Sequence, residues 1–149
     1  MSVTQKLSAA IQDTRYIPAI GRVLAAAIFL NGGLGKALAP AGVERYIASA
    51  GLPFPTLGLI IAIVIEIGGG TLLLLGYRAR LVAIILAAFT IVTALIFHSD
   101  FGNQNQVIHF MKNLAIAGGL LQVAAFGGGS LSIDAKRSPP AALRSGGVR

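Results

Sequence analysis

Four long runs of apolar residues constrain the fold of this chain more than any other feature of its sequence. The runs are residues 17–38, 57–75, 81–97 and 107–126. Each is close to the roughly 20 residues that an α-helix needs to cross the hydrocarbon core of a bilayer. We therefore expect an all-α integral membrane protein, folded as a bundle of four membrane-spanning helices.

Composition supports a bilayer as the solvent. Charged residues make up only 11% of the chain and the mean hydropathy is +0.79, whereas a soluble domain carries about 25% charged residues. The 19 glycines suit membrane helices, because small residues let helix backbones approach one another. With no cysteine in the chain, disulfides, thiol catalysis and Fe–S clusters within it are excluded.

The segments that flank the four spans are polar. Residues 1–16 carry apolar side chains at helical spacing, which predicts an interfacial N-terminal segment. Residues 127–149 are rich in Gly, Ser, Pro and Arg, a composition typical of a flexible basic tail. A signal-peptide cleavage after Ala39 is a weaker alternative, because the first run is longer than a signal core and Pro40 follows the site.

The distribution of Lys and Arg predicts the orientation in the membrane. Nine of them fall on the side of the two termini and of the turn between the second and third runs: Lys6, Arg15, Arg22, Arg78, Arg80, Lys136, Arg137, Arg144 and Arg149. The opposite side has Lys36 and Arg45, with Lys112 inside the fourth run. The positive-inside rule then places both termini in the cytoplasm. Because these cations flank apolar runs, the net charge of +7 indicates membrane orientation and not nucleic-acid binding.

Polar residues inside the spans are expected to gather in the outward half of the bilayer. Glu66 lies near the middle of the second span, and Lys112 lies about two turns inside the fourth. We expect these two to form an ion pair, because an isolated charge costs about 2.5–3.5 kcal/mol at the bilayer centre. Glycines 68–70 and 118–119 would let the two helices approach. Whether the pair is structural or functional stays open.

Around this pair the sequence predicts one outward-facing pocket. Its candidate residues are Glu66, Lys112, His109, Asn113, Asn31 and His98. Phe29, Phe97 and Phe110 would supply its walls. Arg22 and Lys36 are interpreted as structural residues whose long side chains extend to the nearest interface. The two histidines lack the further ligands that a metal or haem site needs, so we expect no metal and no cofactor held within the chain.

Several short motifs resemble those of the DoxX family of small bacterial membrane proteins. The strongest is residues 106–119 (QVIHFMKNLAIAGG). The others are residues 21–22 (GR), 28–36 (IFLNGGLGK), 50–53 (AGLP), 66–70 (EIGGG), 73–76 (LLLG), Arg80, 97–98 (FH) and 129–134 (GSLSID). Their order and spacing cover about residues 17–134, and no single motif decides the assignment.

The resemblance implies a multi-pass protein of the bacterial inner membrane with a link to redox processes. Members of the family are associated with thiosulfate:quinone oxidoreductase, with resistance to quinones and catechols, and with complexes of oxidative-stress enzymes. A bound quinone would receive hydrogen bonds from Lys112 and Asn113, and Glu66 would exchange a proton with it. The alternatives are a non-catalytic scaffold for a partner protein, whose basic tail contacts that partner or anionic lipid, and a small transporter, which would need homo-oligomers.

Overall fold

The computed structural model describes residues 2–3 and 15–137, and within them the chain is helical, without strands. Its elements are α2 (Tyr16–Leu38), α3 (Pro40–Ser49), α4 (Pro55–Ile63), the π-helix η1 (Val64–Gly69), α5 (Gly70–Leu75), α6 (Ala79–Phe97), α7 (Gln104–Phe126) and α8 (Ile133–Arg137). Because α4, η1 and α5 run on without a break, four helices in this part of the chain have the length and apolar character to cross a membrane. The expected four-helix membrane fold is confirmed. The predicted interfacial segment falls almost wholly on residues outside the described range.

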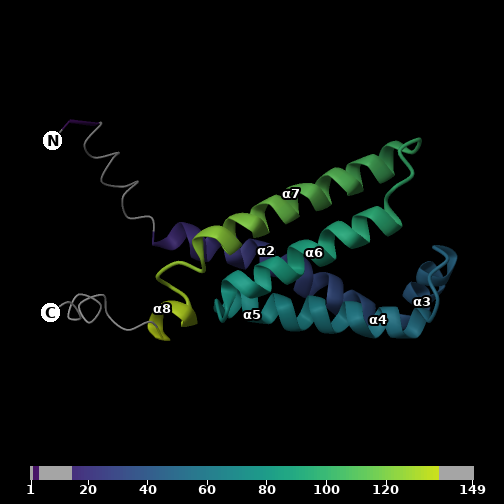
Figure 1. Ribbon diagram of the computed structural model, residues 1–149, viewed down its shortest axis with the longest axis horizontal. Coiled ribbons are helices and arrows are strands. Elements are labelled where there is room, and N and C mark those ends of the chain that lie inside the picture. The colour runs from purple at the N-terminus through teal and green to yellow at the C-terminus, as the bar shows by residue number, and fades with distance from the viewer. Residues whose placement is uncertain (1, 4–14, 138–149) are drawn as a thin grey trace, which may run out of the picture.

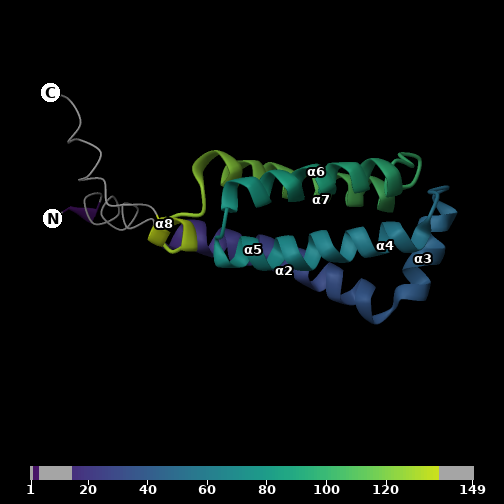
Figure 2. The same ribbon diagram turned by 60° about the horizontal axis from the view of Figure 1, so that its bottom comes forward.

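The four spans form two layers. Figure 2 shows α6 and α7 side by side in one layer, and α2 with α4 and α5 in the other. α6 packs closely along α7, and α2 packs on η1 and α5, whereas α2 and α7 touch only briefly. The start of α2, the turn at residues 76–78 and α8 lie together at one end (Figure 1), which we call the basic end. The helix α3 and the loop at residues 98–103 lie at the other, the α3 end.

The side chains are sorted as a lipid solvent requires. The buried core is built largely of small residues such as Ala26, Ala83 and Ala87, with Leu73 and Leu86 between them. Many large aliphatic side chains instead point away from the bundle on all four spans. A soluble protein rarely leaves such continuous apolar surface in contact with water, so this surface indicates contact with lipid.

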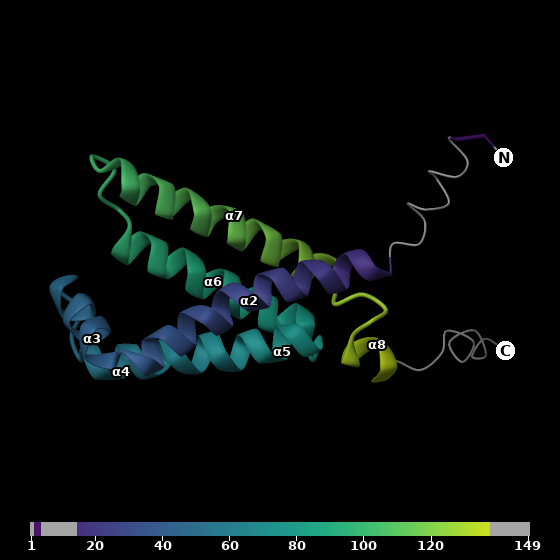
Figure 3. The same cartoon turned by 180° about the vertical axis from the view of Figure 1, so that it is seen from behind.

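The first span ends at Leu38, and the chain then bends into α3. Ala39 has φ −132° and ψ 57°, and Pro40 begins α3 immediately afterwards. Proline has no N–H to continue the hydrogen bonds of the preceding helix, so α2 stops at Leu38. Figure 3 shows α2 crossing α5 obliquely before the chain turns into α3. The end of α2 therefore approaches the middle of its neighbouring span.

Residues 127–137 fold against the basic end, which the tail-like composition of this segment did not predict. The Asp134 carboxylate accepts hydrogen bonds of 2.7 Å from the backbone N–H groups of both Arg78 and Ala79, at the start of α6. These donors have no partner within their own helix, so Asp134 caps α6 from a distant part of the chain. The remainder of the predicted tail, residues 138–149, lies outside the described residues.

Arg22 is buried at the basic end, whereas the sequence led us to expect a side chain that extends to the membrane interface. Only 2% of the residue is exposed. Its guanidinium donates to the carbonyl oxygens of Leu73 at 3.0 Å, Leu74 at 2.8 Å and Leu131 at 2.7 Å. Two of these carbonyls end α5 and the third belongs to the segment after α7. Arg22 thereby ties the first span, the second span and the returning chain together.

Candidate functional site

A bidentate ion pair lies inside the membrane-spanning region, between α2 and η1. Lys36 Nζ donates to Glu66 Oε1 at 2.9 Å and to Oε2 at 2.8 Å. The residue Glu66 is 8% exposed. Long helical side chains lean toward the N-terminus of their helix, so Lys36 reaches back from the end of α2 to the middle of the second span. Its Nζ also lies 3.5 Å from the carbonyl oxygen of Gly32, one turn earlier.

Glycines in α2 let this ion pair form. A Cβ at Gly33 would lie 2.7 Å from Ile67 Cγ1 and 3.0 Å from Glu66 Cβ, so a side chain there would have to displace its neighbours. A Cβ at Gly32 would lie 3.4 Å from Glu66 Oε2. The two glycines therefore bring the backbone of α2 against the carboxylate and its neighbour, as small residues do between membrane helices.

Glu66 belongs to the π-helical segment η1, Val64–Gly69. One turn of this kind inside an α-helix is rare and is found frequently at functional sites. The wider turn shifts the side chains that follow it around the helix axis. Gly69 then faces Leu86 of α6, and Gly70 faces Phe29 and Leu30 of α2.

A cavity of about 450 Å³ opens beside the ion pair toward the α3 end. Its polar lining comes from Lys36, Glu66, Asn113, His98 and Thr93. Its aromatic and aliphatic walls are Tyr46, Phe89, Phe97, Val43, Ile47, Leu52, Ile61, Val92 and Ile96, with Gly58 and Ala62. All four spans and α3 contribute, so the cavity exists only in the assembled bundle. Its volume falls in the range of small-molecule sites, about 300–1,000 Å³.

His98 and Tyr46 line the cavity near the α3 end, and His109 packs against His98. His98 Nδ1 lies 2.7 Å from Gln106 Oε1, and the His98 ring stacks on His109 with centroids 5.0 Å apart. Tyr46 stacks on Phe97 at 5.2 Å, and its hydroxyl donates to the Phe97 carbonyl oxygen at 3.3 Å. Among the described residues no group of three His, Cys, Asp or Glu side chains gathers as metal ligands would.

The predicted pairing of Glu66 with Lys112 is wrong. Lys112 is exposed on the outer side of α7 and is not part of the cavity lining. The expected glycine contact is wrong as well, because a Cβ at Gly118 or Gly119 would meet nothing within 4 Å. The buried positions of α7 are Ala117 and Leu120, which lie on a different side of the helix from Lys112. The direction in which Lys112 points around α7 was therefore predicted wrongly.

The other candidates divide into two groups. His98 and Asn113 line the cavity, and Asn113 Nδ2 donates to the His109 carbonyl oxygen at 2.8 Å. His109 stays outside the lining but contacts His98. Asn31 is exposed on α2 and is absent from the lining. Of the expected walls only Phe97 is in place, since Phe29 is buried in the core and Phe110 packs edge-on against Phe101.

Sequence reasoning missed the role of Lys36. It treated the lysine as an interfacial residue, although Lys36 follows Gly32 and Gly33 by about one helical turn and so lies on the same face of the helix. A lysine near the C-terminal end of a helix, one turn after a pair of glycines, is a usable signal. Its side chain leans back along the helix, and the glycines mark the face where another span approaches.

Comparison with known proteins assigns the family. The DoxX family model matches residues 17–99, which include the first three spans, the ion pair and much of the cavity lining. This chain belongs to the DoxX family. The matched region contains both members of the ion pair, Lys36 and Glu66, and ends before α7.

Two relatives from Escherichia coli extend the match. The chain is 40% identical to the inner membrane protein YqjF over 115 residues, which cover 77% of this chain and 87% of that protein. It is 36% identical to the inner membrane protein YphA over 121 residues, which cover 77% of this chain and 86% of that protein. No solved structure matches. Together with its four membrane-length helices, these relatives identify a multi-pass protein of the inner membrane.

Proposed function

We propose that this DoxX protein binds a small planar carbonyl compound of the quinone type, in the cavity beside Lys36 and Glu66, as part of a redox-linked membrane process. The observation that carries the proposal is the bidentate ion pair at the wall of a cavity of about 450 Å³. A charged pair inside a membrane is a functional-site candidate by default. Here it adjoins space that a ring could fill.

The lining suits such a ligand in both its polar and apolar parts. The Lys36 ammonium has three N–H donors. Two bind the carboxylate, and a ligand carbonyl oxygen would take the third in place of the long contact with the Gly32 carbonyl oxygen, which is 3.5 Å. Asn113 adds amide hydrogen-bonding capacity from α7. The rings of Phe89 and Phe97 offer flat apolar surfaces, on which aromatic rings stack favourably. Each of these residues lines the cavity.

The ion pair would also place a proton acceptor next to the ligand. Glu66 holds the ammonium of Lys36 from one side, so it fixes where the donor points. A ligand whose oxygen gains or loses a proton would find donor and acceptor within one hydrogen-bonding distance of each other. The chain contains no cysteine and so no thiol couple; the proposal assigns the electrons to a redox partner or a second substrate.

The test measures binding of a short-chain quinone to the purified protein in detergent micelles, by equilibrium dialysis. Lys36→Gln and Asn113→Ala are the site variants. Lys112→Gln is the matched control, because it removes a lysine that is exposed and does not line the cavity. The proposal predicts weakening of about tenfold in each site variant, the equivalent of one lost charge-assisted or amide hydrogen bond.

The control should bind as the unchanged protein does. Lys36→Gln can also weaken the bundle, so each variant is first checked for helix content by circular dichroism. Unchanged binding in both site variants, in folded protein, would contradict the proposal. So would equal weakening in the Lys112→Gln control.

A further inference from the structure

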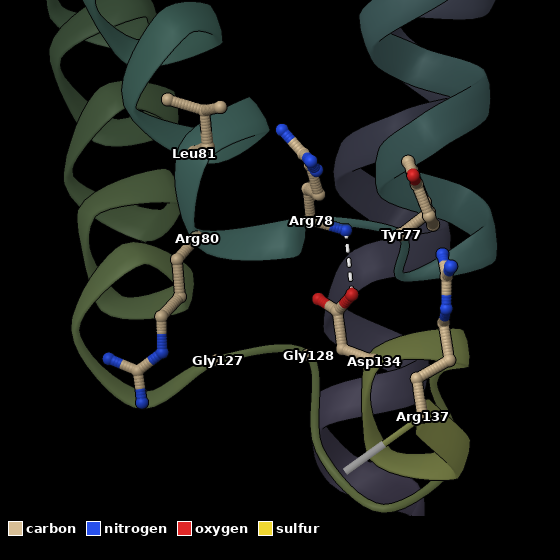
Figure 4. A pocket seen from close by; sticks show the side chains of 8 residues that line it. All are labelled: Tyr77, Arg78, Arg80, Leu81, Gly127, Gly128, Asp134 and Arg137. Carbon is tan, nitrogen blue, oxygen red and sulfur yellow. Dashed lines mark hydrogen bonds between the residues drawn. The ribbon is translucent and has the colours of Figure 1, made fainter.

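The basic end contains a pocket rich in arginine that the proposed function does not use. It has a volume of about 550 Å³, and Arg78, Arg80, Arg137 and Tyr77 are among its lining residues. Figure 4 shows Arg80 beside α7 and Arg137 beside Tyr77, on opposite sides, with Arg78 between them. The pocket lies where the second, third and fourth spans reach the membrane boundary, so it is open to lipid headgroups.

The charges around this pocket favour an anion. Three arginines line the pocket with a single acidic residue, Asp134, whose two carboxylate oxygens accept hydrogen bonds from the backbone N–H groups of Arg78 and Ala79. Arg80 holds the end of α7 through Nη1 alone, with Ala124 and Ala125 as acceptors, so its Nη2 stays available. A hydrogen bond from Arg137, aided by the charges of Arg137 and Arg78, lowers the pKa of the Tyr77 phenol. The pocket thus already stabilises negative charge.

An apolar groove adjoins the pocket. It has a volume of about 650 Å³ and runs between α2 and α7, from Ile17 to Ile28 on one wall and along residues that include Ala115 and Gly119 on the other. Residues 17–28 correspond to roughly 16 Å of helix, enough for much of an acyl chain. Gly127 lines both the pocket and the groove, so the two are neighbours.

We propose that this end of the protein binds one anionic phospholipid. Its phosphate occupies the pocket of Arg78, Arg80 and Arg137, and one of its acyl chains lies in the groove between α2 and α7. Arginine forks match phosphate oxygens well, and basic pockets between membrane helices bind anionic headgroups. A soluble phosphate would use the pocket alone, whereas a phospholipid fills both spaces.

The headgroup is tested by native mass spectrometry of the protein released from micelles containing phosphatidylglycerol. Arg78→Gln/Arg137→Gln is the test variant, and Arg45→Gln, exposed on α3 at the other end, is the matched control. We expect the double variant to retain at least about tenfold less phosphatidylglycerol, since two charge-assisted hydrogen bonds are removed. The control and the unchanged protein should retain it equally. Equal retention in the double variant would overturn the proposal.

Two further arms separate the lipid from other sources of the same chemistry. Phosphatidylcholine should be retained less than phosphatidylglycerol, because it carries no net charge. Inorganic phosphate should raise the melting temperature less than phosphatidylglycerol does, because it leaves the groove empty. An equal rise with inorganic phosphate would overturn the assignment to a lipid.

The groove is tested with two adjacent glycines on α7. A Cβ at Gly118 or at Gly119 would meet nothing within 4 Å, so both positions tolerate a side chain, but only Gly119 lines the groove. Gly119→Leu should therefore lower phosphatidylglycerol retention severalfold, and Gly118→Leu should not. Equal retention in the two variants would overturn the placement of the acyl chain.

Discussion

The ion pair between Lys36 and Glu66 makes a quantitative prediction for a double-mutant cycle. Removing one partner of a buried pair costs about 3–5 kcal/mol, because the other charge is left without compensation. The Glu66 side chain is 11% exposed and that of Lys36 is 28% exposed. Lys36→Met leaves the more buried charge, that of Glu66, without its partner, and the partial exposure of Glu66 reduces the cost in unfolding free energy to about 2–3 kcal/mol. Glu66→Met leaves the more exposed Lys36 without its partner and should cost only about 1–2 kcal/mol, because a long lysine side chain can extend to the interface.

The double variant, Lys36→Met/Glu66→Met, should be more stable than the sum of the two single costs implies. Replacing a buried pair with apolar side chains of similar volume is frequently neutral, so we expect a loss within about 1 kcal/mol of the unchanged protein. The coupling free energy between the two positions is then at least about 2 kcal/mol, because the single costs sum to about 3–5 kcal/mol and the double variant loses at most about 1 kcal/mol. Methionine suits both positions because it is unbranched and fills irregular space.

The assay is reversible unfolding in mixed micelles with increasing sodium dodecyl sulfate, followed by circular dichroism. Lys112→Met is the control, because Lys112 is exposed and lies on the outer side of α7. It should change the free energy of unfolding by less than about 0.5 kcal/mol, as isolated surface substitutions do, and show no coupling to Glu66→Met. Additivity of Lys36→Met and Glu66→Met within about 0.5 kcal/mol would refute the reasoning, as would coupling through Lys112.

Three other predictions concern packing and the basic end. Gly33→Ala should destabilise the fold by about 1–3 kcal/mol through overpacking, because its Cβ would lie 2.7 Å from Ile67 Cγ1. Gly35→Ala is the control and should not destabilise it, because a Cβ there meets nothing within 4 Å; equal melting temperatures of the two variants would contradict this. Arg22→Met should cost about 2–4 kcal/mol, because it removes the guanidinium donors of the Leu74 and Leu131 carbonyl oxygens. Arg22→Lys should not restore the loss, because lysine lacks the planar fork; full rescue in a melting experiment would count against the bonds described. Arg137→Gln should raise the pKa of Tyr77 toward its ordinary value, because it removes the hydrogen bond that lowers that pKa. Ultraviolet titration, with a Tyr77→Phe variant to identify the Tyr77 signal, measures this pKa. An equal Tyr77 pKa with and without Arg137 would argue against the contact between the two side chains.

The spans were predictable from sequence because hydrocarbon thickness fixes the length of an apolar run. The four expected runs correspond to helices whose ends differ from them by a few residues at most. Gly76, with φ 67°, adopts the left-handed conformation that glycine permits at the end of α5.

The partner of Glu66 was not predictable with the reasoning used, for two physical reasons. Depth was counted along parallel spans, but α2 crosses its neighbour obliquely (Figure 3), and the Lys36 side chain leans back along α2, which brings its ammonium to Glu66. The π-helical turn at Val64–Gly69 also leaves no clear signature in the sequence, although it changes which way the following side chains point. Hydropathy gives depth in the membrane and does not give direction around a helix.

The direction of Lys112 could have been obtained from helical spacing. Ala117 and Leu120 are the buried residues of α7, and at 100° per residue Lys112 lies about 140° and 80° away from them. The returning segment at the basic end is a harder case. Its composition is that of a tail, and its order depends on single contacts, such as that of Asp134 with the first N–H groups of α6.

Disulfide trapping tests most directly whether α2, and not α7, faces Glu66. The chain has no cysteine, so only introduced pairs can react. A Cβ at Gly33 would lie within 2.7 Å of Ile67 Cγ1, so Gly33→Cys with Ile67→Cys places the two sulfur atoms within bonding reach. Oxidation of this variant in membranes should form the disulfide, detected by mass spectrometry of its peptides, whereas Gly118→Cys with Ile67→Cys should form none. A disulfide in the second pair and none in the first would contradict the account.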